Sequence, residues 1–268
     1  MGWLDGRRAL VKLVGPNNSG GGVFLKEAVA ELNDVIDIYS GHAYNKAGYD
    51  EWLAVCRKMA ETVAPTRKPL WLDELGKQDE LLRATGAYGN YLAQIVAASI
   101  DAGLQTSLQW LLFDQQYVAP LDTTTNRDSF HRGVHRWGVC KWPHDDIEDP
   151  SSCYPQWYAV SLMSKYLGGR PATRAFESES GPRVKVAATA PGGGLTLLVV
   201  NTSDAPRKFS IELAGGQGKR TLRRHLYDPA AVSPDREARI LPGAAAFRGN
   251  FRDTIPAGGV AVYTTLEP

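Results

Sequence analysis

Four short apolar segments alternate with longer amphipathic segments over the first two-thirds of this 268-residue chain. The longer segments repeat apolar residues every three or four positions, as at Trp52, Cys56 and Met59, which is typical of helices that bury one face. Strands separated by helices form βαβ units with a parallel sheet. We therefore predict strands at residues 9–14, 35–40, 69–75 and 105–113, and helices at residues 23–32, 50–64, 81–102 and 154–167.

The pattern changes after about residue 175, where no helical periodicity remains. Short apolar segments are separated there by turns such as Pro191–Gly194, which predicts an antiparallel β-sandwich. We accordingly divide the chain into an α/β domain at 1–172 and a β-sandwich domain at 173–268. The strands expected in the second domain lie at residues 184–188, 195–201, 208–213, 222–227 and 260–265.

The third apolar segment ends in a carboxylate. Side chains alternate across a strand, so Leu70, Leu72 and Glu74 are expected to share one face. Apolar residues followed by a carboxylate at the C-terminal end are typical of a barrel strand, whose last residue faces the active-site mouth. We expect the two leucines to fill the barrel interior and Glu74 to lie at its mouth. Asp73 is then expected to point away from the interior.

The neighbouring segments also end in chemically useful side chains. By the same alternation His42 and Tyr44 leave the second strand on its inner face, and Trp110 leaves the fourth. A tyrosine hydroxyl beside a carboxylate donates a hydrogen bond that keeps the carboxylate ionised and oriented. We therefore expect these three residues to gather around Glu74.

The motifs VGP, HAY, WLDELG and LQW resemble, in order and spacing, strands five to eight of clan A glycoside hydrolases. The most similar families known to us are the β-xylosidase and α-iduronidase family and the related cellulases and glucosylceramidases. The resemblance implies half of a TIM (β/α) barrel of about four parallel strands, followed by the antiparallel β-sandwich domain. It implies that Glu74 is the nucleophile, with Tyr44 beside it. It also implies that His42 and Trp110 bind substrate; Asn45 is either a sugar contact or a turn residue.

The resemblance is incomplete in one respect. Clan A enzymes carry an Asn-Glu pair at the end of strand four, whose Glu is the acid/base, and this chain has no Asn-Glu dipeptide. Retaining cleavage needs two carboxyl groups roughly 5–5.5 Å apart. We therefore expect a homo-oligomer or a complementing N-terminal half barrel, unless the loop at 114–153 covers the open face. In a dimer, Asp114 of a second copy would be a surrogate second carboxylate.

The resemblance therefore implies a retaining glycosidase that acts on β-linked oligo- or polysaccharides and needs a completing half barrel for the acid/base. The alternatives are a non-catalytic carbohydrate-binding or accessory protein, and an inactive fragment. The 30 basic and 29 acidic residues give no field for nucleic acid or anionic membranes. No apolar run reaches the roughly 20 residues of a membrane span, and the first ten residues do not form a signal peptide. The chain is expected to be cytoplasmic, or secreted as part of a longer precursor.

Three cysteines are present. Cys56 lies on the apolar face of a predicted helix and is expected to be a buried thiol. Cys140 and Cys153 are either a disulfide or two free thiols. No Cys or His spacing indicates a metal site, and we expect neither metal nor cofactor.

Overall fold

The computed structural model describes most of both predicted domains. The described residues are 11–19, 23–83, 85–116, 134–135, 137–141, 153–167, 184–189, 194–213, 220–231 and 246–266. The predicted domain boundary near residue 172 lies outside them.

The first part of the chain is a four-stranded parallel sheet in the order β1-β2-β3-β4. Together with the antiparallel sheets that follow, it confirms the predicted fold class. The strands are β1 (Val14–Ser19), β2 (Ile38–Tyr44), β3 (Leu70–Gly76) and β4 (Thr106–Gln109). The helices are α1 (Val23–Glu31), α2 (Tyr49–Val63), α3 (Glu80–Arg83), α4 (Ala87–Asp101) and α5 (Gln156–Leu167), with a 3-10 turn at Ala64–Thr66. Two short strands after β4, β5 (Gln115–Gln116) and β6 (Val134–His135), pair antiparallel with each other.

Four predicted elements have wrong bounds. The second strand runs from Ile38 to Tyr44 instead of over 35–40, and the fourth ends at Gln109 instead of at 113. The first strand begins at Val14 instead of ending there, and it includes Pro16. β1 is an edge strand, where a proline without an N–H is tolerated. The predicted helix at 81–102 is two helices separated at Gly86, where an added Cβ would lie 2.5 Å from the carbonyl oxygen of Pro229. The sandwich packs against the chain at this break.

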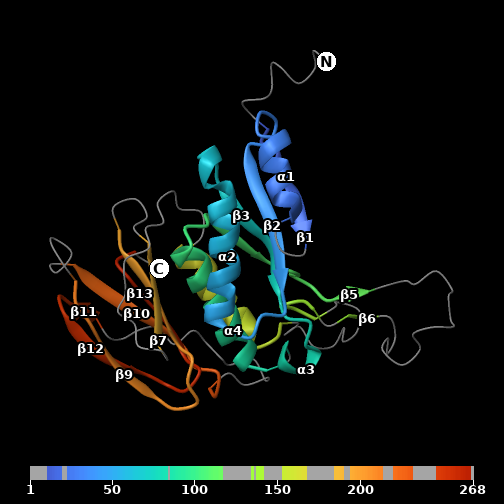
Figure 1. The fold of residues 1–268 in the computed structure, drawn as a ribbon. Helices are drawn as coiled ribbons and strands as arrows, with labels where there is room; N and C mark the ends of the chain where they lie inside the picture. The colour runs from blue at the N-terminus through green and yellow to red at the C-terminus, as the bar shows by residue number, and fades with distance from the viewer. Residues whose placement is uncertain are drawn as a thin grey trace.

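Helices α2 and α4 cover the side of the sheet that faces the β-sandwich (Figure 1). Leu70 and Leu72 are buried in the core that they form with these helices, so the prediction that they fill the barrel interior is wrong. The reason is a β-bulge at Asp73. Gly41 pairs with Leu72, but the next residue, His42, pairs with Glu74, so Asp73 is one extra residue in β3. This residue reverses the alternation, and Glu74 faces the opposite side from the leucines.

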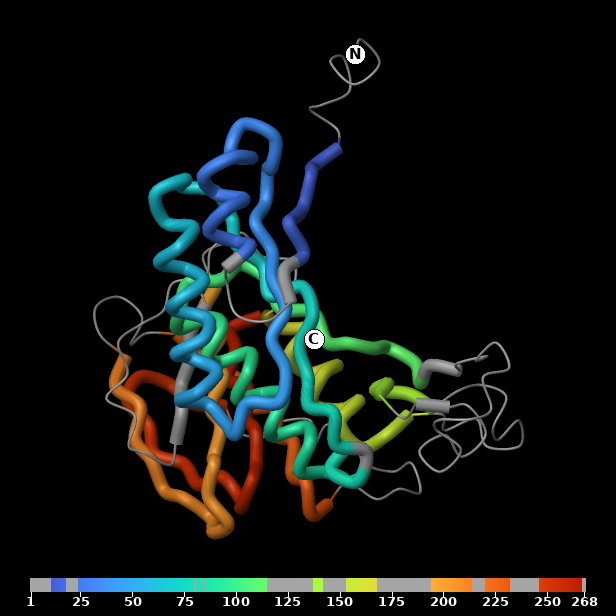
Figure 2. Tube along the Cα trace, turned by 45° about the vertical axis from the view of Figure 1, so that its right-hand side comes forward, coloured from blue at the N-terminus to red at the C-terminus, as the bar shows by residue number. Residues whose placement is uncertain are grey.

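The other side of the sheet is open in the described part of the chain, as the view in Figure 2 also shows. Three apolar side chains in or next to the strands of this sheet are exposed: Leu13 by 47%, Leu108 by 46% and Leu112 by 54%. A closed barrel would bury such residues and would leave no strand edge unpaired. The sheet therefore has the unpartnered apolar face that four strands of a barrel must have.

The second part of the chain contains a five-stranded antiparallel sheet in the order β11-β10-β13-β8-β7, packed on the two-stranded sheet β12-β9. The observed strands that correspond to the predictions at 208–213 and 260–265 begin within one residue of the predicted starts. Two strands, β11 and β12, were not predicted. The strands are β7 (Val184–Thr189), β8 (Thr196–Asn201), β9 (Arg207–Ile211), β10 (Thr221–Tyr227), β11 (Ala246–Arg248), β12 (Phe251–Ile255) and β13 (Val260–Thr264).

Helix α4 joins the two parts. The side-chain amide of Asn90 donates to the carbonyl oxygens of Asn201 (2.9 Å) and Gly258 (2.8 Å). The hydroxyl of Tyr227 donates to the carbonyl oxygen of Gly86 at 2.6 Å. One hydrophobic core includes residues of α4 and of strands β8, β10 and β13. None of the helices in the described ranges is long and apolar enough to cross a lipid bilayer.

Candidate active site

The C-terminal ends of β2, β3 and β4 meet at a cleft of about 250 Å³. The structure thus brings together four of the predicted site residues and adds three that we did not predict. The side chains lining the cleft are His42, Tyr44, Glu74, Gln78, Arg83, Trp110 and Trp137.

Tyr44 and Glu74 form the central contact of the cleft. The hydroxyl of Tyr44 donates to Oε2 of Glu74 at 2.5 Å. Burial of the phenol, together with this hydrogen bond and the negative charge of Glu74, raises the pKa of Tyr44 well above its ordinary value. The phenol therefore remains a hydrogen-bond donor throughout the neutral range. A charge-assisted bond of this kind fixes the orientation of the carboxylate.

His42 also contacts Glu74, with Nδ1 3.2 Å from Oε2. Its other ring nitrogen, Nε2, lies against Oδ1 of Asn17 and 3.4 Å from Oδ1 of Asp73. Asp73 therefore lies on the same side of the sheet as His42, and the prediction that it points away is wrong. The bulge in β3 is the cause, because it places two consecutive carboxylates around one imidazole. An imidazole held on both nitrogens has a fixed ring plane, and this fixes Glu74 from a second direction.

Arg83 connects the segments that carry the site, and it is only 1% exposed. Nε donates to the carbonyl oxygen of Lys77, just after β3, and Nη1 donates to the carbonyl oxygen of Trp137. Both Nη atoms lie 3.5 Å from the carbonyl oxygen of Trp110, just after β4. The guanidinium also lies over the ring of Tyr88, 5.2 Å from its centroid. One planar side chain thus links three separate loops.

Two indoles line the cleft. Trp110 was predicted from its place at the end of the fourth strand; its peptide bond to Leu111 is cis. Trp137 was not predicted, since it belongs to the long polar loop after that strand. Of the two alternatives for Cys140 and Cys153, the structure shows the disulfide. Cys56 is a buried free thiol, as predicted.

Asn45 and Asp114 lie outside the cleft lining. Asn45 has a positive φ of 59° and exchanges two hydrogen bonds with Gln78, so it holds Gln78 at the cleft as a turn residue does. Asp114 is 3% exposed and accepts hydrogen bonds from the amide of Gly138 (2.9 Å) and the hydroxyl of Tyr154 (2.8 Å). These contacts favour a structural role for Asp114 within this chain.

Glu74 is the one carboxylate among the described residues that line the cleft. The arrangement provides a carboxylate held in one orientation between aromatic walls, which suits attack on an electrophilic carbon. It does not by itself provide a second carboxyl group at the separation that retaining cleavage needs. Across the described ranges, no group of three or more His, Cys, Asp or Glu residues is placed to hold a metal ion.

Comparison with solved structures finds this fold in glycoside hydrolases. A family 30 subfamily 8 xylanase from Clostridium acetobutylicum matches with a TM-score of 0.66 and 13% identity, over 96% of this chain and 56% of that one. A family 30 endoxylanase from Clostridium papyrosolvens C71 matches with a TM-score of 0.61 and 14% identity, over 95% and 56%. A family 51 α-L-arabinofuranosidase from Bifidobacterium longum matches with a TM-score of 0.55 and 14% identity, over 96% and 60%.

The chain shares part of the fold of these glycoside hydrolases, a four-stranded part of the barrel followed by the sandwich. The chain spans little more than half the length of the two xylanases. No protein-family model matches the sequence. Comparison with curated protein sequences likewise finds no match.

Proposed function

We propose that this chain is part of a retaining glycoside hydrolase that cleaves β-linked glycans, with Glu74 as the nucleophile. The observation that carries the proposal is the 2.5 Å hydrogen bond from Tyr44 to Glu74 inside an aromatic-walled cleft. The activities of the structural neighbours, two xylanases and an α-L-arabinofuranosidase, support a carbohydrate substrate.

In this proposal an oxygen of Glu74 attacks the anomeric carbon of the bound sugar, and the bond to the leaving oxygen breaks. Tyr44 and His42 hold the carboxylate so that one oxygen is directed at that carbon. Trp110 binds the apolar face of the sugar ring. Water then hydrolyses the glycosyl ester and releases Glu74, with the proton transfers carried out by a second carboxyl group.

The second carboxyl group is proposed to come from a completing half barrel, either a second copy of this chain or a separate N-terminal half. Two observations support this. The chain spans 56% of the length of each xylanase, and Leu13, Leu108 and Leu112 leave apolar surface on the open side of the sheet. Burial of such surface contributes about 25 cal/mol per Å², which favours association.

The proposal is tested by light scattering on a sizing column, with a panel of aryl β-glycosides assayed on the same fractions. A dimer whose hydrolysis requires Glu74 supports completion by a second copy. A monomer without turnover contradicts that form of the proposal. If such a monomer binds sugars, it supports the second candidate function, a carbohydrate-binding protein. The aromatic lining and the lone cleft carboxylate are the observations that favour this candidate.

Replacing Tyr44 with Phe should lower kcat on aryl β-glycosides by about 10²-fold, since one preorganised donor to the reacting carboxylate is lost. KM should change little, because the phenol contacts the enzyme carboxylate and not the sugar. Tyr39→Phe on the same strand is the matched control, since its hydroxyl donates to Asn33 away from the cleft. Equal kcat values for the two variants would contradict the assigned role of Tyr44.

A further inference from the structure

Trp137 reaches the cleft from a short segment, residues 137–140, that runs beside residues 111–114. The amide of Leu111 donates to the carbonyl oxygen of Trp137 at 3.2 Å. The amide of Cys140 donates to the carbonyl oxygen of Leu112, and the amide of Asp114 donates to that of Cys140, each at 2.9 Å. These bonds fasten segment 137–140 to the chain that follows Trp110, so the two indoles are carried by paired backbone.

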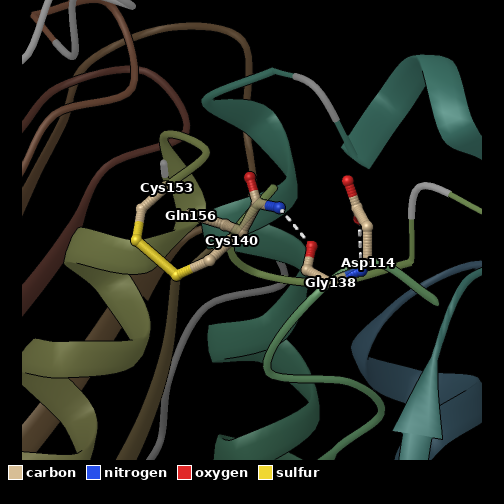
Figure 3. Close-up of a disulfide and its surroundings, with 5 residues drawn as sticks. All are labelled: Asp114, Gly138, Cys140, Cys153 and Gln156. Atoms are coloured by element: carbon tan, nitrogen blue, oxygen red, sulfur yellow. Dashed lines mark hydrogen bonds between the residues drawn. A yellow bond between two sulfur atoms is a disulfide. The ribbon is translucent and has the colours of Figure 1, made fainter. Parts of the chain in front are cut away.

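The same segment is fastened on its other side to the start of α5. The disulfide joins Cys140 to Cys153, and the amide of Tyr154 donates to the carbonyl oxygen of Val139 at 2.9 Å. The side-chain amide of Gln156, which is fully buried, donates to the carbonyl oxygen of Gly138 at 3.2 Å. Figure 3 shows the disulfide, Gln156 and Asp114 around this segment. A covalent bond therefore holds the backbone three residues from an indole of the cleft.

The backbone around Gly138 is packed too closely for a side chain. An added Cβ at this residue would lie 2.3 Å from the amide nitrogen of Asp114 and 2.5 Å from the carbonyl oxygen of Cys140. Arg83 holds the neighbouring residue, because its Nη1 donates to the carbonyl oxygen of Trp137. Trp137 is thus held by backbone pairing, a guanidinium and a disulfide, although it lies in an otherwise polar loop.

An indole fixed in this way suits the binding of a pyranose ring. One face of a pyranose consists of C–H groups, and an indole offers a large apolar face together with an N–H donor. Because the backbone of Trp137 is already ordered, little conformational entropy remains to be lost when a ligand binds. The cleft also contains Glu74 and Gln78, whose polar groups can hydrogen-bond to sugar hydroxyls.

We propose that Trp137 is a second carbohydrate-stacking wall of the cleft and that the Cys140–Cys153 disulfide holds it there, so that reducing the disulfide weakens sugar binding. The inference rests on the proposed function for its ligand class, a neutral β-pyranoside. It goes beyond that function by assigning a binding residue and a redox dependence to the site.

The test measures the binding of methyl β-D-xylopyranoside, methyl β-D-glucopyranoside and methyl β-D-galactopyranoside to the full chain by saturation-transfer NMR. For whichever of these probes binds, Trp137→Ala should raise Kd roughly three- to tenfold, and Trp137→Tyr should restore most of the affinity. Dithiothreitol should raise Kd by a similar factor in the wild type, and reoxidation should reverse the change. Trp157→Phe on α5 is the control, since Trp157 does not line the cleft.

Near-UV circular dichroism and thermal unfolding of each sample distinguish the loss of the Trp137 contact with the sugar from unfolding of the protein. The inference is overturned if none of the three glycosides binds, if folded Trp137→Ala binds as tightly as the wild type, or if reduction leaves Kd unchanged. Binding that depends on Trp137 without any hydrolysis would uphold the inference while the proposed function fails. Hydrolysis that depends on Glu74, together with sugar binding that is unchanged in Trp137→Ala, would support the proposed function and overturn the inference.

Discussion

Replacing Glu74 with Gln is expected to abolish covalent labelling of the protein by 2,4-dinitrophenyl 2-deoxy-2-fluoro-β-glycosides. The wild type should gain the mass of one fluorosugar, attached to Glu74 through an ester bond. The dinitrophenolate leaves without protonation, so this step does not need an acid/base carboxyl group. The fluorine slows release of the sugar, so the ester accumulates. Loss of the nucleophile should lower the labelling rate by on the order of 10⁴-fold or more.

The measurement is intact-protein mass spectrometry followed by peptide mapping, with gluco, xylo and galacto reagents. Glu61→Gln is the matched control, because Glu61 is an exposed carboxylate on α2 far from the cleft lining. A label on another residue, or equal labelling rates in the Glu74→Gln and Glu61→Gln proteins, would rule out the assigned nucleophile.

Replacing Arg83 with Met is expected to lower the free energy of unfolding of the α/β part by about 1–3 kcal/mol. The guanidinium donates to the carbonyl oxygens of Lys77 and Trp137 and lies 3.5 Å from that of Trp110. Methionine cannot donate to any of the three, although the Trp137 carbonyl keeps the Leu111 amide and the Trp110 carbonyl keeps the side-chain amide of Gln109. The Lys77 carbonyl loses the donor, and a buried carbonyl left without one costs about 1–3 kcal/mol. The loss should also displace Trp137, and sugar affinity should fall with stability.

Urea unfolding followed by tryptophan fluorescence checks this prediction. Trp157 is the last of the seven tryptophans, so the signal reports on the α/β part and not on the sandwich strands. Arg57→Met is the control, since Arg57 is exposed on α2 and its replacement should change stability by no more than about 0.5 kcal/mol. Equal midpoints for the two variants would show that Arg83 does not link the site loops.

The sequence was sufficient to predict the parallel sheet and the face shared by His42 and Tyr44, because both follow from local periodicity. It was not sufficient to place Asp73, Leu70 and Leu72. One extra residue in β3 places the side chains before the bulge on the opposite face from the one that alternation counted back from Glu74 predicts. The alternating sequence pattern does not reveal where such a bulge occurs. The contacts of His42 with both Asp73 and Glu74 could be recognised only once the pairing of β2 with β3 was known.

Arg83 and Trp137 escaped prediction for a different reason. Each acts through contacts with residues distant in the chain, and neither stands in a motif. Arg83 follows a short polar stretch after β3, which is typical of a surface helix, yet it is among the most buried side chains of the described residues. Two tryptophans, Trp137 and Trp142, follow the predicted fourth strand before α5, and the sequence did not indicate which indole reaches the cleft.

Helix α4 has a consequence for how this protein can change during evolution. Buried residues make up 11 of its 15 positions, and they face the parallel sheet on one side and the sandwich on the other. Gly89 shows how close the second contact is, since an added Cβ there would lie 2.6 Å from the ring of Tyr227. The sandwich is therefore not an exchangeable module. A recombination event that replaced the sandwich with another β-domain would need a domain whose surface is already complementary to α4. A substitution on α4 must also remain compatible with both the parallel sheet and the sandwich.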